Sequence, residues 1–296
     1  MPRPKLDLAV GFATCGRADI LLEAVLQLNN QTRPPDRVII CYTKLEDVAG
    51  LDGFALGHGH VTMVQSAPGL PLQRNVIIDR VQDCDVVLFL DDDFLVAPGY
   101  LAHIEAALSA HPDIVAATGT PIADDIKGPG LSVAAGRALI AADGPAPDGF
   151  DPASHAYGCN MAINIAAARE HGIRFDERLP LYAWSEDMDF THRLGRFGRI
   201  VKLRGARGVH LGVKRGRSSG RRLGYSQVAN PIYLRNKGSY SWRRALGSVG
   251  RNLAANGLRA FWSEPYIDRR GRLLGNGLAF LDLLRGRLQP ERVLEL

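Results

Sequence analysis

Three consecutive carboxylates, Asp91, Asp92 and Asp93, follow an uninterrupted apolar run from Val86 to Leu90. The run is typical of a buried strand, so the acids are predicted to lie at the carboxyl edge of a sheet, where open α/β folds place their ligands. Neighbouring carboxylates repel one another unless a cation or hydrogen-bond donors compensate them. Oxygen ligands suit Mg²⁺ or Mn²⁺, and either ion would in turn hold a diphosphate. The alternative is a helix cap or an exposed acidic loop, although capping requires one acid rather than three.

A second acidic cluster, Glu186, Asp187 and Asp189, lies where a helix is predicted to begin, with the Ser185 hydroxyl as its cap. The free N–H groups and the dipole of a helix N-terminus favour ionised carboxylates, and a general base must be ionised. Acids in a first turn are also ordinary helix design. The cluster therefore indicates chemistry only in combination with Asp91–Asp93.

Several common motifs do not occur in the sequence. There is no G-x-G-x-x-G after the first strand, no G-x-x-x-x-G-K-[ST] loop and no G-x-S-x-G elbow. Dinucleotide oxidoreductases, P-loop NTPases and serine hydrolases are therefore disfavoured. A phosphatase-like hydrolase also uses a D-x-D motif after an apolar strand, but that motif normally continues to Thr or Val where Leu95 stands here.

Together, the motifs resemble those of the inverting glycosyltransferases of family 2, which have the GT-A fold. The resemblance runs from about Leu6 to Asn236, and Ala13 replaces the family's usual Pro. Five motifs carry the resemblance. The Thr- and Arg-containing turn is Ala13–Arg17, the Arg-Asn pair is Arg74–Asn75 and the D-x-D motif is Asp91–Asp93. The small-residue strand is Gly158–Ala162 and the Glu-Asp motif is Glu186–Asp187.

The resemblance implies an enzyme that moves a sugar from a nucleoside-diphosphate sugar to an acceptor hydroxyl in one displacement. Asp187 would be the general base, with Glu186 beside it, and Asp93 would bind the Mn²⁺ or Mg²⁺ that bridges the donor phosphates. Asp91 would meet the ribose or share the metal. The donor-binding residues are expected to be Thr14, Arg17, Arg74, Asn75, Asp91 and Asp92.

Two features leave alternatives open. His210 is either a further metal or diphosphate ligand, as a His in this region is in many relatives, or a hydrogen-bonded structural residue. The second strand runs into Ile40–Lys44 without the acids that often meet the nucleotide, so the nucleotide is not predicted. A catalytically inactive binding subunit with the same fold is the alternative from a different functional class.

The elements that must position these residues alternate between apolar strands and amphipathic helices. This pattern predicts an α/β fold of the GT-A type: a doubly wound, mostly parallel sheet with helices on both faces. One helix follows Pro98, with Leu101, Ile104 and Leu108 on one face, and another carries Phe190, Leu194 and Phe197. The strands are predicted at Leu8–Ala13, Arg37–Tyr42, His60–Gln65, Asp85–Leu90, Asp113–Thr118, near Leu131–Ala141 and at Ile200–Leu203.

The last third of the chain is strongly basic. Residues 201–296 hold 20 Lys and Arg against 5 Asp and Glu, whereas residues 1–200 hold 16 against 26. The basic, Gly- and Ser-rich stretch 214–222 is either a lid over donor phosphates or a solvated linker, and the remainder is predicted to be helical, with a leucine stripe from Leu274 to Leu288. The predicted domains are a catalytic domain at 1–212, a basic flexible segment and acceptor-side helix at 213–240, and an Arg-rich helical extension at 241–296.

Composition limits the remaining choices. The chain has 296 residues, 46% of them hydrophobic, and 32 Gly and 17 Pro without a collagen-like repeat, so disordered and fibrous classes are excluded. Its four cysteines lack metal or redox spacing and are predicted to be buried thiols. Neither a spanning segment nor a signal peptide is predicted, which indicates a cytoplasmic protein. The expected partners are a glycan or lipid-linked acceptor and an anionic inner membrane surface or a partner subunit for the Arg-rich helices, with nucleic acid disfavoured and the oligomeric state not predicted.

Overall fold

The computed structural model describes residues 5–51, 57, 60–216, 218–261 and 264–296, so Arg217 of the predicted basic stretch lies outside the described residues. The chain forms two compact units, each built from separate segments. The first unit comprises Met1–Pro68, Gln73–Arg174 and Phe190–Gly216, and the second comprises Gly69–Leu72, Phe175–Asp189 and Arg217–Leu296.

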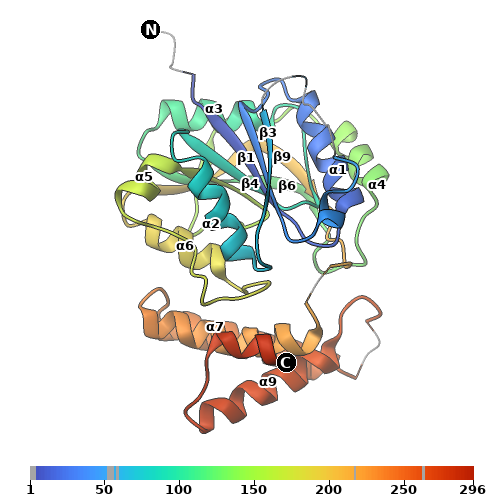
Figure 1. Cartoon of the computed structure of the whole chain (residues 1–296), viewed down its shortest axis with the longest axis vertical. Helices are drawn as coiled ribbons and strands as arrows, with labels where there is room; N and C mark the ends of the chain where they lie inside the picture. Colours follow the sequence, from blue (N-terminus) through green and yellow to red (C-terminus); the bar gives the residue numbers. More distant parts are fainter. Residues whose placement is uncertain (1–4, 52–56, 58–59, 217, 262–263) are drawn as a thin grey trace. The chain divides into compact units, whose positions relative to one another are not determined.

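The first unit is built on a sheet that has nine strands among the described residues (Figure 1). Its order is β3-β2-β1-β4-β8-β6-β9-β5, with β7 beside β9. Strands β1 to β4 run parallel, but β8 lies antiparallel between β4 and β6, so the sheet is mixed beyond β4. The strands are β1 (Leu8–Ala13), β2 (Arg37–Tyr42), β3 (His60–Gln65), β4 (Val86–Leu90), β5 (Phe94–Val96), β6 (Ile114–Asp124), β7 (Phe150–Pro152), β8 (Asn160–Asn164) and β9 (Arg199–His210).

Helices cover both faces of this sheet, because alternate side chains of each strand point to opposite faces. Val10 and Phe12 of β1 join a buried cluster with Leu21 of α1. On the opposite face Gly11 leaves room for α2, since a Cβ there would lie 2.8 Å from Ile77. The predicted α/β class is confirmed. The helices and 3-10 turns up to the last strand are α1 (Ala18–Gln27), η1 (Leu28–Asn30), η2 (Leu45–Val48), α2 (Leu70–Arg80), α3 (Tyr100–Ala110), α4 (Val133–Ala142), α5 (Ile165–Glu170) and α6 (Glu186–Leu194).

The strand predicted near Leu131–Ala141 is wrong, because this segment forms helix α4. The Ser132 hydroxyl caps the helix by accepting from the Ala135 N–H at 3.1 Å, and the segment is rich in alanine, the strongest helix former. Its buried Gly136 lies against Leu211 and Leu95, so the apolar residues that suggested a strand instead pack a helix on the sheet.

Two further predictions need correction in their extent. Strand β9 continues from Arg199 to His210, well past the predicted end at Leu203, because its second half pairs with β5, which the prediction did not include. Phe190 and Leu194 of α6 are buried as predicted, but Phe197 lies beyond the helix, is 46% exposed and stacks on His171.

All four cysteines are free, and three of them, Cys41, Cys84 and Cys159, are buried as predicted. Cys15 is exposed, because it lies in the turn between β1 and α1 rather than in a strand.

The second unit contains α7 (Gly220–Lys237), α8 (Trp242–Arg259), α9 (Arg269–Leu284) and η3 (Pro290–Glu295), which confirms the helical C-terminal extension. Tyr225, Val249 and Ala279 of the three helices share one buried cluster with Val293. Helices α7 and α9 approach closely through glycines, since a Cβ at Gly275 would lie 2.0 Å from the Arg221 carbonyl oxygen. Among the described residues, no helix is both long and apolar enough to span a bilayer.

The leucines of the predicted stripe divide between core and solvent. Leu278 and, beyond the end of α9, Leu288 pack against the buried cluster of this unit, whereas Leu274 is 67% exposed and Leu284 is 85% exposed. The fully buried residues of α9 are small or polar: Gly275, Asn276, Ala279 and Asp282.

Candidate active site

Strand β4 delivers the three predicted carboxylates to one end of the sheet. All five residues of β4 are buried, and the chain turns at Asp91–Asp93 before it enters β5. The turn is fixed by two backbone hydrogen bonds, from the Asp91 N–H to the Cys159 carbonyl and from the Phe94 N–H to the Asp91 carbonyl, both 3.0 Å.

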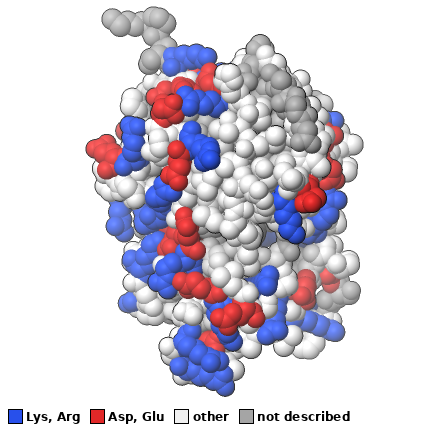
Figure 2. Space-filling view, in the orientation of Figure 1, with Lys and Arg blue, Asp and Glu red and all other residues white. Residues whose placement is uncertain are grey.

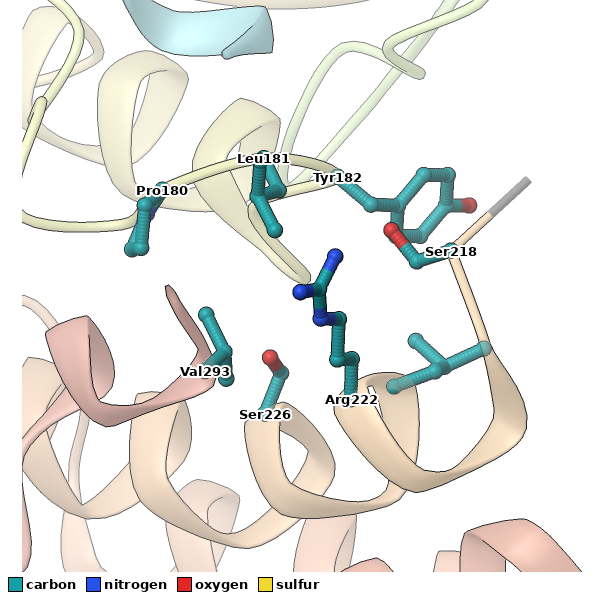
Figure 3. Close-up of a pocket in the computed structure, with 8 residues that line it drawn as sticks. Pro180, Leu181, Tyr182, Ser218, Arg222, Ser226 and Val293 are labelled. Carbon is teal, nitrogen blue, oxygen red and sulfur yellow. The ribbon is translucent and has the colours of Figure 1, made fainter. Parts of the chain in front are cut away.

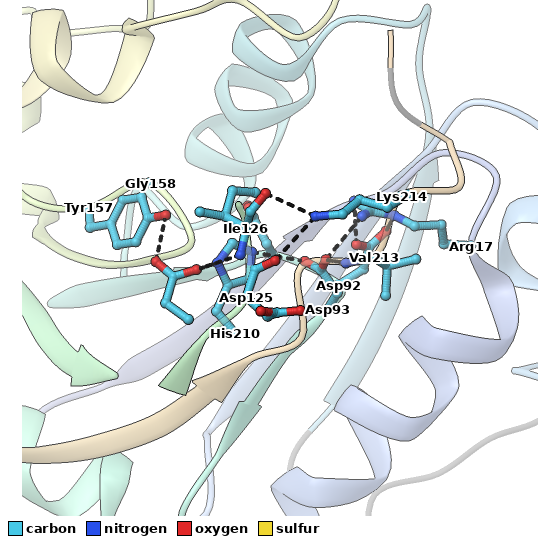
Figure 4. Close-up of polar contacts among 12 residues, drawn as sticks. Arg17, Asp92, Asp93, Asp125, Ile126, Tyr157, Gly158, His210, Val213 and Lys214 are labelled. Carbon is cyan, nitrogen blue, oxygen red and sulfur yellow. Dashed lines mark hydrogen bonds and ion pairs between the residues drawn. The ribbon is translucent and has the colours of Figure 1, made fainter. Parts of the chain in front are cut away.

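Asp91, Asp93 and His210 form a cluster whose candidate ligand atoms all lie within 4.8 Å of one another. Strand register explains why Asp93 and His210 lie close together, because β5 and β9 are antiparallel and Phe94 is the register partner of His210. His210 Nε2 lies 3.4 Å from Asp93 Oδ1, and both side chains are buried (Figure 4). Two carboxylates and an imidazole are a donor set that Mn²⁺ or Mg²⁺ accepts.

Asp124 is a member of this site that the sequence analysis did not identify. It ends β6, which continues beyond the predicted Thr118, and its register partner is His210. Its carboxylate lies 2.8 Å from His210 Nδ1 and accepts from the Tyr157 hydroxyl at 3.1 Å. Asp124 is thus placed to orient the imidazole, as a partner on the second nitrogen of a ligating His does. The sequence signal was weak, because Asp124 lies in a Gly-, Ala- and Pro-rich stretch.

The charges of this cluster are strongly coupled. Burial by itself would lower the pKa of His210, but hydrogen bonds to Asp124 and Asp93 outweigh it and raise the pKa to about 10. Burial likewise opposes ionisation of Asp93, yet the His210 hydrogen bond and the charge of Arg17 hold the pKa of Asp93 below its usual value. The two carboxylates around His210 therefore favour the protonated imidazole.

Thr14, Arg17 and Asp92 also come together. The Arg17 guanidinium lies 2.6 Å from Asp92 Oδ1 and 3.2 Å from Asp93 Oδ2, and the Thr14 hydroxyl donates to Asp92 Oδ2 at 2.8 Å. Asp92 is fully buried, and burial raises its pKa. Its carboxylate therefore ties the turn after β1 to the acids after β4.

The Arg-Asn pair lies in α2, and both side chains are buried. Arg74 donates to the Gly158 carbonyl at 2.7 Å and lies 3.3 Å from Asp91 Oδ1. It thus brings positive charge to Asp91 from the face of the sheet that α2 covers. The structure places Asn75 beside Arg74 in α2, with 2% of its surface exposed.

Glu186 and Asp187 occupy the first turn of α6 in the second compact unit, whereas the cluster of Asp91, Asp93 and His210 belongs to the first. Asp187 Oδ1 accepts from the Met188 N–H at 2.8 Å. The preceding loop is strained, because Leu181, Ala183 and Ser185 all have positive φ values, of 58°, 52° and 75°. Such backbone is costly for residues other than glycine and is often retained where function requires it.

Within the second unit this loop packs on α7. Leu179 and Ala183 share a buried cluster with Leu234 and Tyr240, and Asn230 donates to the Trp184 carbonyl at 3.0 Å. A hollow of about 10 Å³ between Tyr182 and Arg222 is large enough for no more than water (Figure 3). The loop that leads into Glu186 therefore packs against the C-terminal helices of its own unit.

No family model and no curated protein matches this chain. Solved structures do match it. A mannosyltransferase from Pyrobaculum calidifontis in complex with GDP-Man and Mn²⁺ aligns over 99% of this chain and 86% of its own, with a TM-score of 0.56 at 14% identity. S. aureus TarS 1-349 aligns over 98% and 90%, with a TM-score of 0.57 at 15% identity.

The chain has a GT-A-like fold. A third match is GalNAc-T7 with UDP, GalNAc and Mn²⁺, which aligns over 96% of this chain and 59% of its own, with a TM-score of 0.58 at 16% identity. In this GT-A-like chain the cluster of Asp91, Asp93 and His210 follows the buried central strand β4, at the sheet edge where such α/β folds bind ligands.

Proposed function

We propose that this protein is a metal-dependent glycosyltransferase that transfers a sugar from a nucleoside-diphosphate sugar to an acceptor hydroxyl with inversion. The observation that carries the proposal is the cluster of Asp91, Asp93 and His210 at the end of β4 in a GT-A-like chain. One structural neighbour is a mannosyltransferase solved with GDP-Man and Mn²⁺, and another, GalNAc-T7, was solved with UDP, GalNAc and Mn²⁺.

The residues present fit a divalent cation. Asp93 and Asp91 offer carboxylate oxygens and His210 offers an imidazole nitrogen, and Asp124 supports the second imidazole nitrogen. A Mn²⁺ or Mg²⁺ ion held by this set would stabilise the negative charge that develops on the departing diphosphate. Thr14, Arg17 and Arg74 contact Asp91, Asp92 or Asp93, and these three residues, together with Asn75 and Asp92, are proposed to hold the donor.

Asp187 is proposed as the general base. Its carboxylate would accept the proton of the acceptor hydroxyl while the oxygen attacks the anomeric carbon from the face opposite the diphosphate. The helix N-terminus favours negative charge at Asp187, and Glu186 adds a second carboxylate in the same turn. One displacement on one face gives inversion at the sugar.

The acceptor is proposed to be a glycan or a lipid-linked glycan of polysaccharide or cell-envelope synthesis, with the enzyme cytoplasmic or peripheral at the inner face of the membrane. This part of the proposal follows from the resemblance to family 2 enzymes. The donor nucleotide is left as UDP or GDP, because β2 ends without the acids that would discriminate between nucleotides.

The test is release of UDP or GDP by the full chain from a panel of nucleotide sugars, with Mn²⁺, with Mg²⁺ and with EDTA. We expect release with at least one donor in the presence of a divalent ion and none with EDTA. The Asp93→Asn variant should lose at least about a hundredfold in rate, since it removes a metal ligand, while Asp113→Asn, at an exposed ion pair with Arg199, should retain the activity. Donor binding without turnover would instead identify a binding subunit, and metal-dependent hydrolysis of phosphate monoesters would identify a phosphatase.

A further inference from the structure

Several leucines of helix α9 are exposed to solvent. Leu273, Leu274, Leu281 and Leu284 are between 39% and 85% exposed. At about 100° per residue these four side chains fall within an arc of about 100° on one side of the helix. We call them the exposed leucine stripe. Monomeric soluble proteins rarely expose contiguous apolar surface of this kind without a binding role.

Helix α8 repeats this arrangement. Leu246 is 60% exposed and Leu258 is 67% exposed, and Phe261, just after the helix, is 85% exposed. The core side of the same helix is formed by Ala245, Val249 and Asn256. Two helices of the second unit therefore each carry an apolar face that its own core does not use.

The charged residues of these two helices are almost all basic. No Asp or Glu occurs from residue 201 to residue 263, so α8 carries only arginines among its charged residues. In α9 the acid is Asp282, which is 4% exposed and is held by Arg287 and Tyr225. Arg270 and Arg285 flank the exposed leucine stripe and are themselves exposed. In Figure 2, Lys and Arg side chains gather at the lower end of the view, over the C-terminal helices.

We propose that the exposed leucine stripe of α9 and the apolar face of α8 bind an anionic phospholipid bilayer. Leucines and Phe261 would enter the boundary between headgroups and acyl chains, and the flanking arginines would contact lipid phosphates. A second copy of the chain suits this surface less well, because a symmetric contact would bring two copies of the same arginine-rich surface together. The inference rests on α8 and α9 alone and not on the proposed catalytic activity.

The experiment is co-sedimentation of the full chain with vesicles of phosphatidylcholine, with or without 30% phosphatidylglycerol, at about 0.1 M salt. We expect binding to the anionic vesicles and little to the neutral ones. The variant Leu274→Asp/Leu284→Asp should bind at least about tenfold more weakly, because it removes two apolar anchors and adds negative charge. Both positions are exposed, so the variant should unfold at the same temperature as the wild type.

The matched control is Leu45→Asp in η2 of the first unit, a leucine that is 70% exposed but belongs to neither apolar face. It should bind anionic vesicles like the wild type. A second variant, Arg251→Ala/Arg285→Ala, keeps the leucines and should reduce the preference for anionic over neutral vesicles. The proposal is overturned if the wild type ignores anionic vesicles, if Leu45→Asp loses as much binding, or if sedimentation velocity shows a dimer that Leu274→Asp/Leu284→Asp dissociates.

Discussion

At the residue scale, the buried carboxylates of the candidate site are compensated by nearby cationic side chains. Arg17 lies against Asp92 and Asp93, Arg74 lies against Asp91, and His210 lies between two carboxylates. Buried ions are tolerated only when partners compensate them, so removal of one partner leaves a costly unpaired charge. The acids are therefore held in place before any ligand arrives.

The Arg17→Ala variant should lower the free energy of unfolding by about 3–5 kcal/mol, because it leaves the fully buried Asp92 without its cation. The control is Arg215→Ala, whose ion pair with Asp19 is 57% and 63% exposed and should cost about 1 kcal/mol or less. Urea denaturation measures both values. Equal losses in the two variants would contradict a structural role for Arg17.

The Asp187→Asn variant should turn over about 10²- to 10⁴-fold more slowly, since general base catalysis typically contributes that much. Its thermal unfolding should be nearly unchanged, because Asp187 is not buried in the core of its unit. Steady-state nucleotide release measures the rate, with Asp113→Asn as the control for a neutralised surface acid. A rate near that of the wild type would refute the assignment of the base.

At the scale of elements, the sequence predicts β1, β2 and β3 to the residue, because all three are short runs of apolar, aromatic or β-branched side chains that favour strands, although β3 is largely exposed. It fails for α4, where a strand was predicted. In this segment and in α9 the apolar residues are visible in the sequence, but which of them meet a core is decided by tertiary packing. The fully buried residues of α9 are small or polar, so they carry little hydrophobic signal.

The Gly275→Ala variant should destabilise the protein by about 1–3 kcal/mol, because its Cβ would lie 2.0 Å from the Arg221 carbonyl oxygen of α7, and backbone cannot move aside easily. Gly277→Ala in the same helix meets no atom within 4 Å and should stabilise by about 0.5–1 kcal/mol through helix propensity. Chemical denaturation of the two variants gives opposite signs if α7 and α9 pack as described. A stabilised Gly275→Ala would show that they do not.

The segment 175–185 is attached to α7 by Asp176, which accepts from Tyr233 at 2.8 Å and from Lys237 at 2.5 Å. Burial alone would raise the pKa of Asp176, but these hydrogen bonds outweigh it and hold the pKa below its ordinary value of 3.8. Because the folded-state pKa is the lower one, this stabilisation is present above pH 3.8 and is lost as the pH falls through the lowered value.

The Asp176→Asn variant should therefore be less stable than the wild type by about 1–3 kcal/mol at pH 7. The difference should shrink between about pH 4 and pH 2, where the wild type loses the same interaction. Thermal unfolding across this pH range measures it, with the exposed Asp148→Asn as control. A difference that does not change with pH would show that the ion pair is not its source.

At the scale of the whole molecule, the candidate site gathers residues that are far apart in the chain. Asp91, Asp93 and Arg17 were predictable because each belongs to a short motif with its own residue pattern. The meeting of His210 with Asp124 was not, because it depends on the register of β6 with β9, a parallel pair joined across β-bulges. The register between two distant strands is set when the sheet assembles, so it cannot be predicted from the local residue pattern of either strand.

Mn²⁺ should raise the unfolding temperature of the full chain, because an ion that binds only the folded state stabilises it by mass action. At a concentration about a hundred times the dissociation constant, the gain is about 2.7 kcal/mol. EDTA should reverse the shift, and Asp93→Asn should abolish it. Asp113→Asn should retain it. No shift in the wild type at millimolar Mn²⁺ would argue against a metal site at Asp91, Asp93 and His210.

Because each unit is built from separate segments, the chain cannot be divided into independent fragments at a single position. Residues 175–189, which contain Glu186 and Asp187, fold on helices that the chain reaches only after Gly216. A fragment ending at residue 212 would therefore encode the whole sheet but leave the strained loop before Glu186 without the helices that hold it. Truncation or domain exchange at that point would keep Asp187 in the fragment but remove the helices on which its segment folds.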